Sequence, residues 1–348
     1  MFTEEKLAAL RARYVNGRTD VVIDPDRKKA VDMVFKPDGQ RRKPYSGVST
    51  FLDAPYRPDA PDMADYGGVQ VALVGVPMDL AVTNRSGSRF GPRAVRSVER
   101  IGPYHHVHRV APLAELRVAD VGDVPFRSRY SLPDSIADIE AFYTTLHAAG
   151  VIPVSIGGDH SISYPILRAL GRDRPVGLVH IDAHCDTSGD MEGSRFHHGG
   201  PFRQAVLDGV LDPERTIQIG IRGSAEMLYE FSYASGMTVI HAEEVDTMGL
   251  AAVIAKARAV VGDGPFYLSF DVDALDPAYT PGTGTPEVGG LTPREAQHIL
   301  RGLTGLDLIG GDVVEVAPQY DATSVTAQIG AMMAFEIVSL LALRARAT

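Results

Sequence analysis

Three separated segments of the chain place histidine and aspartate at spacings that suit metal binding. Each segment follows a short apolar run, at residues 152–156, 176–181 and 266–270, that predicts a buried strand. Two imidazoles and four carboxylates are too many donors for one ion, and they suit two divalent ions that share bridging carboxylates. The candidate ligands are His160, Asp182, His184, Asp186, Asp271 and Asp273.

The spacing of these residues indicates that they converge. Side chains on a strand alternate between its two faces, so we expect Asp182, His184 and Asp186 to point the same way. Cys185, at an intervening position, is then expected to pack in the core. Converging ionised carboxylates repel one another unless cations neutralise them, which favours a metal site. Turn and capping roles, the ordinary alternative for aspartate at a strand end, would explain one such segment but not three.

The composition excludes several classes of protein. The 348 residues are 45% hydrophobic, which suits a globular chain with one large α/β domain or two small ones. A formal charge of −10 and the lack of a basic patch with interleaved aromatic residues argue against a nucleic-acid partner. The single Cys favours a reducing compartment, and no apolar run suggests a signal peptide or a membrane span. We therefore expect a cytoplasmic protein without a membrane partner.

From residue 69 onward, apolar strand-like runs alternate with helical patterns. This alternation predicts a mostly parallel sheet covered by helices on both faces, and ligands of such sheets bind beyond the carboxyl ends of the strands. All three candidate metal segments fall at those ends. The expected strands cover residues 69–76, 152–156, 176–181, 216–221, 237–241, 266–271 and 309–315. The expected helices cover residues 93–100, 131–149, 165–170, 201–208, 251–261, 292–302 and 328–344.

The first 66 residues differ from the rest of the chain. Residues 2–15 are expected to form a short surface helix. Residues 18–61 are rich in charge, Pro and Gly and are expected to form an irregular arm. The chain is thus divided into an N-terminal arm or extension at residues 1–66 and one α/β domain at residues 67–348.

The motifs resemble those of the ureohydrolase family, which includes arginases, agmatinases and guanidino-acid hydrolases. The resemblance runs from about residue 69 to the end, so residues 67–348 would form the family's catalytic domain. The motifs occur in the family's order and at compatible separations. They are Ser155-Ile-Gly-Gly-Asp-His160, His180-Ile-Asp-Ala-His-Cys-Asp186, His198-Gly-Gly-Pro201, Ser269-Phe-Asp-Val-Asp-Ala-Leu-Asp-Pro277 and Val314-Glu-Val316.

This resemblance implies a three-layer α/β/α fold (arginase-like) with a mostly parallel central sheet and two Mn²⁺ ions, with Ni²⁺ as the alternative. It also implies a homo-oligomer, a trimer or a hexamer, in which the apolar C-terminal helix could serve an interface. One ion would be held by His160, Asp182, Asp186 and Asp271. The other would be held by Asp182, His184, Asp271 and Asp273.

The implied reaction is hydrolysis of a guanidino compound to urea, or a substituted urea, and an amine. Two metals lower the pKa of a bridging water, which makes hydroxide available at neutral pH. Asp186 would orient the hydroxide and His198 would carry a proton to the leaving nitrogen. Glu315 would bind the guanidinium by charge-assisted hydrogen bonds. His197 stays open as an alternative shuttle, and His198 and Glu315 could instead be a packed loop histidine and a solvated acid.

Four other histidines are expected to have no part in the chemistry. His105, His106 and His108 lack a carboxylate partner nearby in sequence and are expected at the surface or an interface. His180 precedes the end of a ligand strand and is expected to face the core.

The residues define the tail of the substrate less well. Arg195, in the loop before the shuttle histidine, could pair a carboxylate, which favours guanidinopropionate or guanidinobutyrate. Asp190 or Glu192 could instead pair the ammonium of agmatine. Asn84 lies in a Thr-Asn-Arg stretch that resembles guanidino-acid hydrolases more than agmatinases. The N-terminal extension would suit a small guanidine, such as free guanidine, an N-alkylguanidine or a biguanide, and arginine is disfavoured.

Two alternatives come from other classes of protein. A non-catalytic partner subunit of a hetero-oligomer should have lost ligands, whereas this chain keeps the complete set. A zinc deacetylase of the same general fold would use one ion and fewer carboxylates. Metal stoichiometry separates the three, because two ions per chain indicate the ureohydrolase, one the deacetylase and none the silent subunit.

Overall fold

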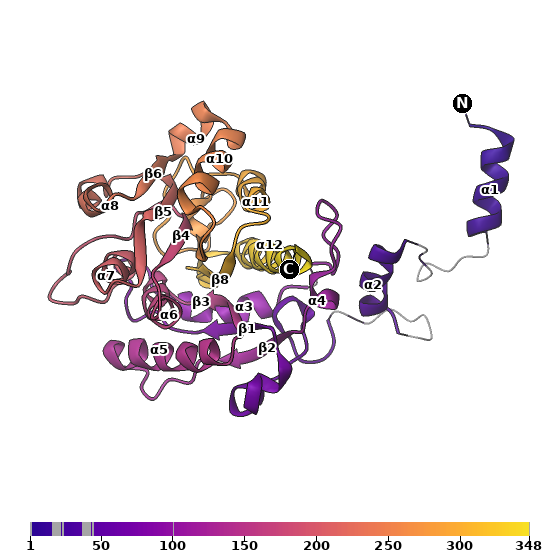
Figure 1. The fold of residues 1–348 in the computed structure, drawn as a ribbon. Helices are drawn as coiled ribbons and strands as arrows, with labels where there is room; N and C mark the ends of the chain where they lie inside the picture. The colour runs from indigo at the N-terminus through magenta and orange to yellow at the C-terminus, as the bar shows by residue number, and fades with distance from the viewer. Residues whose placement is uncertain are drawn as a thin grey trace.

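An eight-stranded parallel sheet forms the centre of the molecule (Figure 1). The computed structural model describes residues 2–15, 22, 24–36, 43, 45–99 and 101–347. The strands are β1 (Val71–Val76), β2 (Val118–Asp123), β3 (Ile152–Gly157), β4 (Val176–Ile181), β5 (Leu211–Ile221), β6 (Thr238–His241), β7 (Phe266–Asp271) and β8 (Leu308–Val314). They lie in the order β2-β1-β3-β8-β7-β4-β5-β6.

Helices cover both faces of this sheet, which makes it the middle of three layers (Figure 1). The helices are α1 (Glu4–Tyr14), α2 (Pro25–Val34), α3 (Gly91–Arg96), α4 (Pro112–Glu115), α5 (Leu132–Ala148), α6 (Ser163–Leu170), α7 (Pro201–Leu207), α8 (Glu230–Ser235), α9 (Ala242–Met248), α10 (Leu250–Val261), α11 (Pro293–Gly302) and α12 (Val325–Ala347). On one face, α3, α10, α11 and α12 pack against strand residues such as Val71 and Leu73. On the other face, α5, α6 and α7 pack against the intervening residues, such as Ala72 and Val74. Because side chains alternate along a strand, each apolar run supplies both cores, and the predicted α/β/α fold is confirmed.

Local signals explain where two of these helices begin. The side chain of Thr292 accepts a hydrogen bond from the N–H of Glu295 at 3.3 Å, and the Glu295 carboxylate accepts from the N–H of Thr292 at 2.8 Å. This reciprocal capping fixes the start of α11. Ser131 caps α5 in the simpler way, by accepting from the N–H of Asp134 at 3.4 Å. Both helices begin where the sequence predicts.

The sequence analysis missed the edge strand β2, because polar residues interrupt its apolar pattern. Asp120 is buried in this strand and pairs with Arg96, with 2.8 Å between Nε and Oδ2. The guanidinium of Arg96 in turn lies over the ring of Phe51, 3.9 Å from its centroid. The sequence does not show that the charge of Asp120 is buried together with that of Arg96, which is what allows this polar residue inside a strand. The short helices α8 and α9 were also not predicted.

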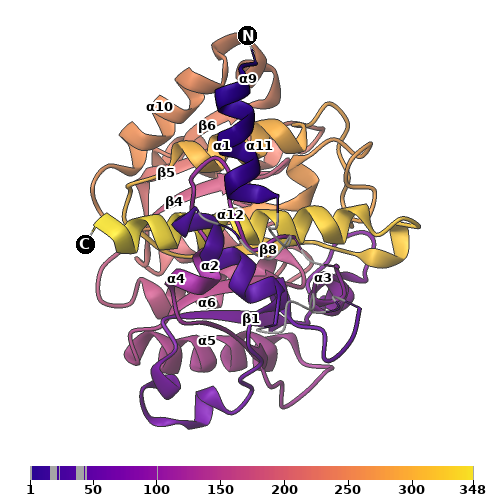
Figure 2. The same ribbon diagram turned by 90° about the vertical axis from the view of Figure 1, so that its right-hand side faces the viewer.

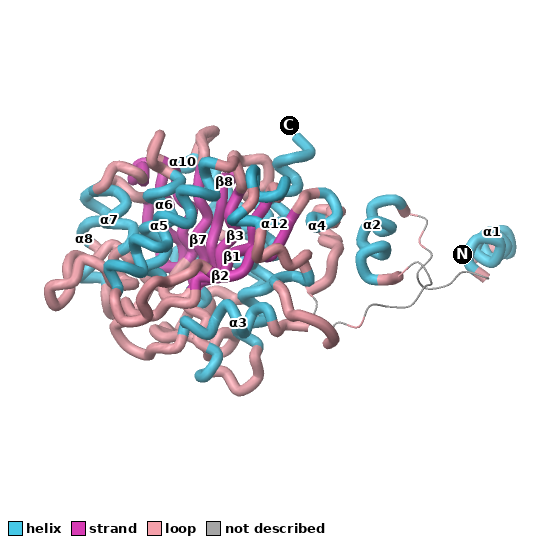
Figure 3. The backbone as a smooth tube through the Cα atoms, turned by 90° about the horizontal axis from the view of Figure 1, so that it is seen from below, coloured by secondary structure: helices cyan, strands magenta, loops and turns pink. Residues whose placement is uncertain are grey.

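The N-terminal segment contains two helices that project from the body, beyond α4 and α12 (Figures 2 and 3). The helix expected at residues 2–15 is confirmed as α1, which buries no residue. The expectation of an irregular arm was wrong for α2, which begins at the capping residue Asp24 and is attached to the body by a 3.1 Å contact between Arg109 and Asp24. Other parts of the expected arm, at residues 16–21, 23, 37–42 and 44, lie outside the described residues.

The segment just before residue 67 packs into the body. Phe51 and Ala54 are buried in the core that contains α3 and α12. Tyr66 is buried in the core on the opposite face of the sheet. The packed body therefore starts ahead of residue 67, the boundary expected from the sequence.

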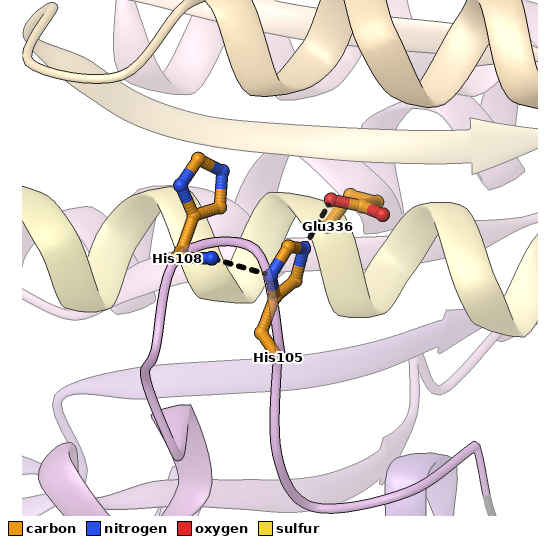
Figure 4. Close-up of side chains that lie close together, drawn as sticks. All are labelled: His105, His108 and Glu336. Atoms are coloured by element: carbon orange, nitrogen blue, oxygen red, sulfur yellow. Dashed lines mark hydrogen bonds and ion pairs between the residues drawn. The ribbon is translucent and has the colours of Figure 1, made fainter. Parts of the chain in front are cut away.

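A buried charged cluster anchors α12 (Figure 4). Its centre is Glu336, which accepts hydrogen bonds from Arg301 Nε at 3.1 Å and from His105 Nε2 at 2.8 Å. The other ring nitrogen of His105 accepts from the backbone N–H of His108 at 3.1 Å. The expectation that His105 lies at the surface or an interface was wrong, because its carboxylate partner is 231 residues away in the sequence. Both ring nitrogens of His105 are occupied, so we assign no metal to this cluster.

The C-terminal helix α12 is long and apolar enough to span a membrane, a property that the sequence analysis overlooked. In this chain 78% of its most apolar stretch is buried, and the helix packs against β3 and β8. A core helix of this kind passes the same test of length and composition. The exposed residues of α12 are Gln328 near its start and residues 345–347 at its end, so an interface on this helix would have little surface to use.

Candidate active site

Three loops meet at the carboxyl end of the sheet, where they follow β3, β4 and β7. They bring together all six predicted metal ligands. Five of these side chains are buried, and that of His184 is 17% exposed. The site therefore lies where ligands of a parallel sheet are expected.

His160 is the centre of the first donor group. Its Nδ1 lies 3.0 Å from Asp182 Oδ2, 2.9 Å from Asp186 Oδ2 and 3.3 Å from Asp271 Oδ2. One hydrogen cannot serve three carboxylates, and within the described residues no hydrogen bond of good geometry reaches this buried nitrogen. Two ligands of one ion at about 2.1 Å and at a right angle stand about 3.0 Å apart. The spacing thus fits a metal position.

His184 is the centre of the second donor group. Its Nδ1 lies 3.5 Å from Asp182 Oδ1 and 3.2 Å from Asp273 Oδ2. Asp182 therefore gives one oxygen to each group, as a bridging carboxylate does. Asp271 Oδ1 accepts from the N–H of Asp273 at 2.8 Å, which holds the two aspartates of β7 and its loop in register. Donors of this number and type fit two divalent ions.

Without bound cations, the negative charges of these carboxylates repel one another. Burial, and then the charges of Asp273 and Asp182, raise the pKa of Asp271 well above its usual range. Burial and the charge of Asp182 raise the pKa of Asp273 to about 6. Cations bound among the carboxylates would reduce this electrostatic repulsion, so the electrostatics also fit a metal centre.

The ligands converge by a different route from the one expected. β4 ends one residue before Asp182, so Asp182, His184 and Asp186 lie in the loop beyond the strand and not at alternating strand positions. Asp186 has a φ of 52°, a left-handed conformation that reverses the chain toward the site. Cys185 is buried beside Tyr229, and the expectation that it packs in the core is confirmed.

His198 and Glu315 lie together next to the ligands. His198 Nδ1 is 2.8 Å from Glu315 Oε1, which also accepts from the backbone N–H of His160 at 2.9 Å. The second oxygen, Oε2, is buried and has no hydrogen-bond partner in the part of the chain that the structure describes. Burial is the largest single effect and disfavours the cationic form of His198. The charge of Glu315, its hydrogen bond and the charges of Asp186 and Asp159 together outweigh burial and raise the pKa of this histidine to about 9. His197 is engaged elsewhere, 2.8 Å from the carbonyl oxygen of Gly189.

A cavity of about 190 Å³ opens above the ligands. Its polar side is formed by metal ligands and His198, together with Ser188, Thr83 and Thr285. Its opposite wall is apolar and comes from two segments that are well separated in the sequence. The wall residues are Met191, Ala225, Leu228 and Tyr229.

The residues predicted to select the substrate tail lie outside this cavity. Arg195 donates to Tyr164 Oη at 3.2 Å, on the outer side of its loop. Asp190 and Glu192 are exposed. Asn84 donates to a backbone carbonyl at 3.2 Å. The loop that supplied these predictions contributes Met191 instead, and the rest of the wall follows β5, where no sequence motif marks it.

His180 supports a ligand, which the sequence analysis did not foresee. It is buried, as expected, but its Nε2 lies 2.7 Å from Asp182 Oδ2. Its Nδ1 accepts from the side-chain amide of Gln218 at 3.0 Å, so the ring donates to the carboxylate. The spacing of two residues between His180 and Asp182 was the available signal, whereas Gln218 carried none.

Known proteins resemble this chain over most of its length. A family model described as the arginase family matches residues 69–339. Guanidinopropionase from Pseudomonas aeruginosa is 50% identical over 302 residues, which cover 86% of this chain and 93% of that protein. The mitochondrial agmatinase of Gallus gallus is 46% identical over 299 residues, which cover 85% of this chain and 86% of that protein.

A solved structure extends the likeness to three dimensions. Proclavaminate amidino hydrolase from Streptomyces clavuligerus superposes with a TM-score of 0.81 at 32% sequence identity, over 87% of this chain and 100% of that chain. The range matched by the family model, residues 69–339, includes all eight strands and the loops that carry the donor groups. On this evidence the chain belongs to the arginase family.

Proposed function

We propose that this chain hydrolyses a small guanidino compound to urea, or a substituted urea, and an amine. The free oxygen of Glu315 carries the proposal, because it is buried beside the metal ligands without a hydrogen-bond partner among the described residues. A guanidinium presents planar N–H donors that would satisfy this oxygen and pair with its charge.

Each residue near the cavity then has a role. Two divalent ions, when bound to the six ligands, make hydroxide available at neutral pH; we propose Mn²⁺, with Ni²⁺ as the alternative. Asp186, which lines the cavity, would orient the nucleophile. Glu315 would hold the guanidinium, and His198 would give its proton to the leaving nitrogen.

The cavity favours a short substituent that carries no charge. Met191 and Leu228 offer apolar contact, and among the described lining residues there is no Lys or Arg to pair a carboxylate. Its three aspartates are metal ligands and are not free to pair an ammonium. We therefore propose free guanidine or an N-alkylguanidine as the substrate. A guanidino acid is the second candidate, favoured by the 50% identity to guanidinopropionase.

Urea release from a panel of substrates tests the proposal. The panel holds guanidine, methylguanidine, dimethylguanidine, guanidinopropionate, guanidinobutyrate and agmatine, with the protein loaded separately with Mn²⁺ and Ni²⁺. We expect a guanidine without a charged substituent to give the highest kcat/KM. Leu228→Arg adds a cation to the apolar wall and should shift the preference toward guanidinopropionate. A wild-type preference for a charged tail would refute the assignment of the tail, and a metal-loaded protein that releases no urea from any compound would refute the reaction.

The pH profile of turnover should show the titration of His198. We expect kcat to fall as the pH rises above the raised pKa of His198, because the histidine then loses the proton that it gives to the leaving nitrogen. Below that pH the raised pKa keeps it protonated, so this group leaves kcat unchanged. The comparison needs wild type, His198→Asn and, as a matched control, His197→Asn. A high-pH limb that survives in His198→Asn would assign it to another group.

A further inference from the structure

A chain of hydrogen bonds runs from a metal ligand into the sheet, on the side away from the cavity. His160 Nε2 lies 2.7 Å from Ser269 Oγ, on β7. Ser269 Oγ donates to Asp312 Oδ1, on β8, at 2.7 Å. The other oxygen of Asp312 accepts from the hydroxyls of Ser163 at 2.6 Å and Tyr267 at 2.9 Å. All five residues are buried.

The chemistry of the donors and acceptors fixes the direction of this chain. His160 Nδ1 faces three carboxylate oxygens and can bind a metal only through its lone pair, so its ring hydrogen must be on Nε2. Nε2 then donates to Ser269, and the serine hydrogen is free to turn toward Asp312. A carboxylate only accepts hydrogen bonds, so Asp312 is the last acceptor. Both hydrogen bonds therefore run in one direction, from His160 through Ser269 to Asp312.

Asp312 also lacks the partner that a buried carboxylate usually has. Its hydrogen-bond partners among the described residues are three hydroxyl groups, and none of them is a cation. Such a group is costly to bury unless a charge nearby compensates it. The hydrogen-bond chain connects it instead to the metal position on the far side of His160. The carboxylate thus behaves as the outer part of a carboxylate–histidine–metal arrangement, with a serine hydroxyl between the carboxylate and the ring.

We propose that Ser269 and Asp312 are positioning residues that hold His160 in the tautomer whose Nδ1 binds metal. The proposal deepens the proposed function, because it concerns the same metal site. It is tested by metal binding and not by turnover. Metal-free wild-type protein would count against the proposed function, whereas an Asp312 variant that keeps both ions would count against this inference alone.

Asp312→Asn is the decisive variant, because it replaces one acceptor oxygen of the carboxylate by a donor NH₂ group while the side chain keeps almost the same shape. The two hydroxyls on Oδ2 continue to need an acceptor, so the amide oxygen stays there and the NH₂ group faces Ser269. Ser269 then accepts from the amide, and its own hydrogen, which has lost Asp312 as an acceptor, is free to turn to His160 Nε2. The ring hydrogen moves to Nδ1, where it blocks the metal.

We expect the affinity for the ion at His160 to fall roughly 10- to 100-fold. Metal content after equilibration with limiting Mn²⁺ should fall from two ions per chain toward one, as measured by elemental analysis and titration calorimetry. Nitrogen NMR shifts of His160 in the metal-free protein should show the exchange of tautomers. Tyr267→Phe is the matched control: it removes one donor to the same carboxylate but preserves the polarity, so both ions should be retained.

Two outcomes would overturn the inference. One is an Asp312→Asn variant that binds two ions with wild-type affinity. The other is equal loss of metal in Asp312→Asn and Tyr267→Phe, which would mean general loosening of the buried cluster. If Asp312→Asn does not fold, Ser269→Ala decides, because it removes the acceptor for Nε2 and should also weaken the ion at His160. Ser339→Ala, which removes a buried hydroxyl within α12, controls for the loss of one buried hydrogen bond.

Discussion

Replacement of Glu315 by glutamine is expected to lower kcat/KM by about 10³-fold while both metal ions stay bound. The oxygen that accepts from the backbone N–H of His160 and from His198 Nδ1 must remain an acceptor, so the glutamine oxygen takes this place. The NH₂ group then replaces the free oxygen and presents hydrogens to the N–H groups of a guanidinium. His198 also loses the charge that raises its pKa.

Steady-state kinetics with the preferred guanidine, together with metal analysis, would check this result. Glu140→Gln is a matched control, because it makes the same chemical change on α5 at a surface carboxylate that faces Arg168. Near-normal turnover of Glu315→Gln would show that Glu315 does not bind the guanidinium as proposed. Loss of metal along with activity would instead show that the residue acts through His160.

Asp271→Asn is the second change with a large expected effect, and its effects on activity and stability are opposite. Asp271 is proposed to bridge the two ions, so its loss as a ligand should remove the metals and lower turnover by about 10³-fold or more. The metal-free protein should nevertheless become more stable at neutral pH, by about 1 kcal/mol or more. The reason is that burial, and the neighbouring Asp273 and Asp182, raise the pKa of Asp271, so its ionised form opposes folding above the pKa that it has in the unfolded chain.

The sign of this stability effect gives an internal control. A carboxyl whose pKa is raised in the folded state costs stability as the pH rises through the interval between its unfolded and folded values. Below that interval wild type is protonated at Asp271 and should unfold at the same denaturant concentration as the variant. Chemical denaturation of both metal-free proteins at acidic and neutral pH would show this. Equal stability of metal-free wild type and Asp271→Asn at neutral pH would mean that the neighbouring carboxylates do not destabilise the ionised form of Asp271.

The convergence of the six candidate ligands was predictable because each lies in a short local motif next to an apolar run. Strand alternation predicted this convergence for the wrong reason, since Asp182, His184 and Asp186 sit in a loop whose shape depends on a left-handed Asp186. What could not be predicted depends on pairs that are distant in sequence. Glu336 neutralises Arg301 and holds His105 from another element, and Asp312 reaches His160 only because β8 lies beside β7.

The position of β8 also has a consequence for how the protein folds during its synthesis on the ribosome. It is the last strand in the sequence, yet it lies between β3, which His160 follows, and β7, which ends at Asp271. A ribosome delivers the chain from its N-terminus at about 5–20 residues per second, so both strands emerge before the one that must separate them. The 3.3 Å approach of His160 to Asp271 is therefore completed only after β8 has been inserted. A chain that ends before β8 should therefore lack a complete site.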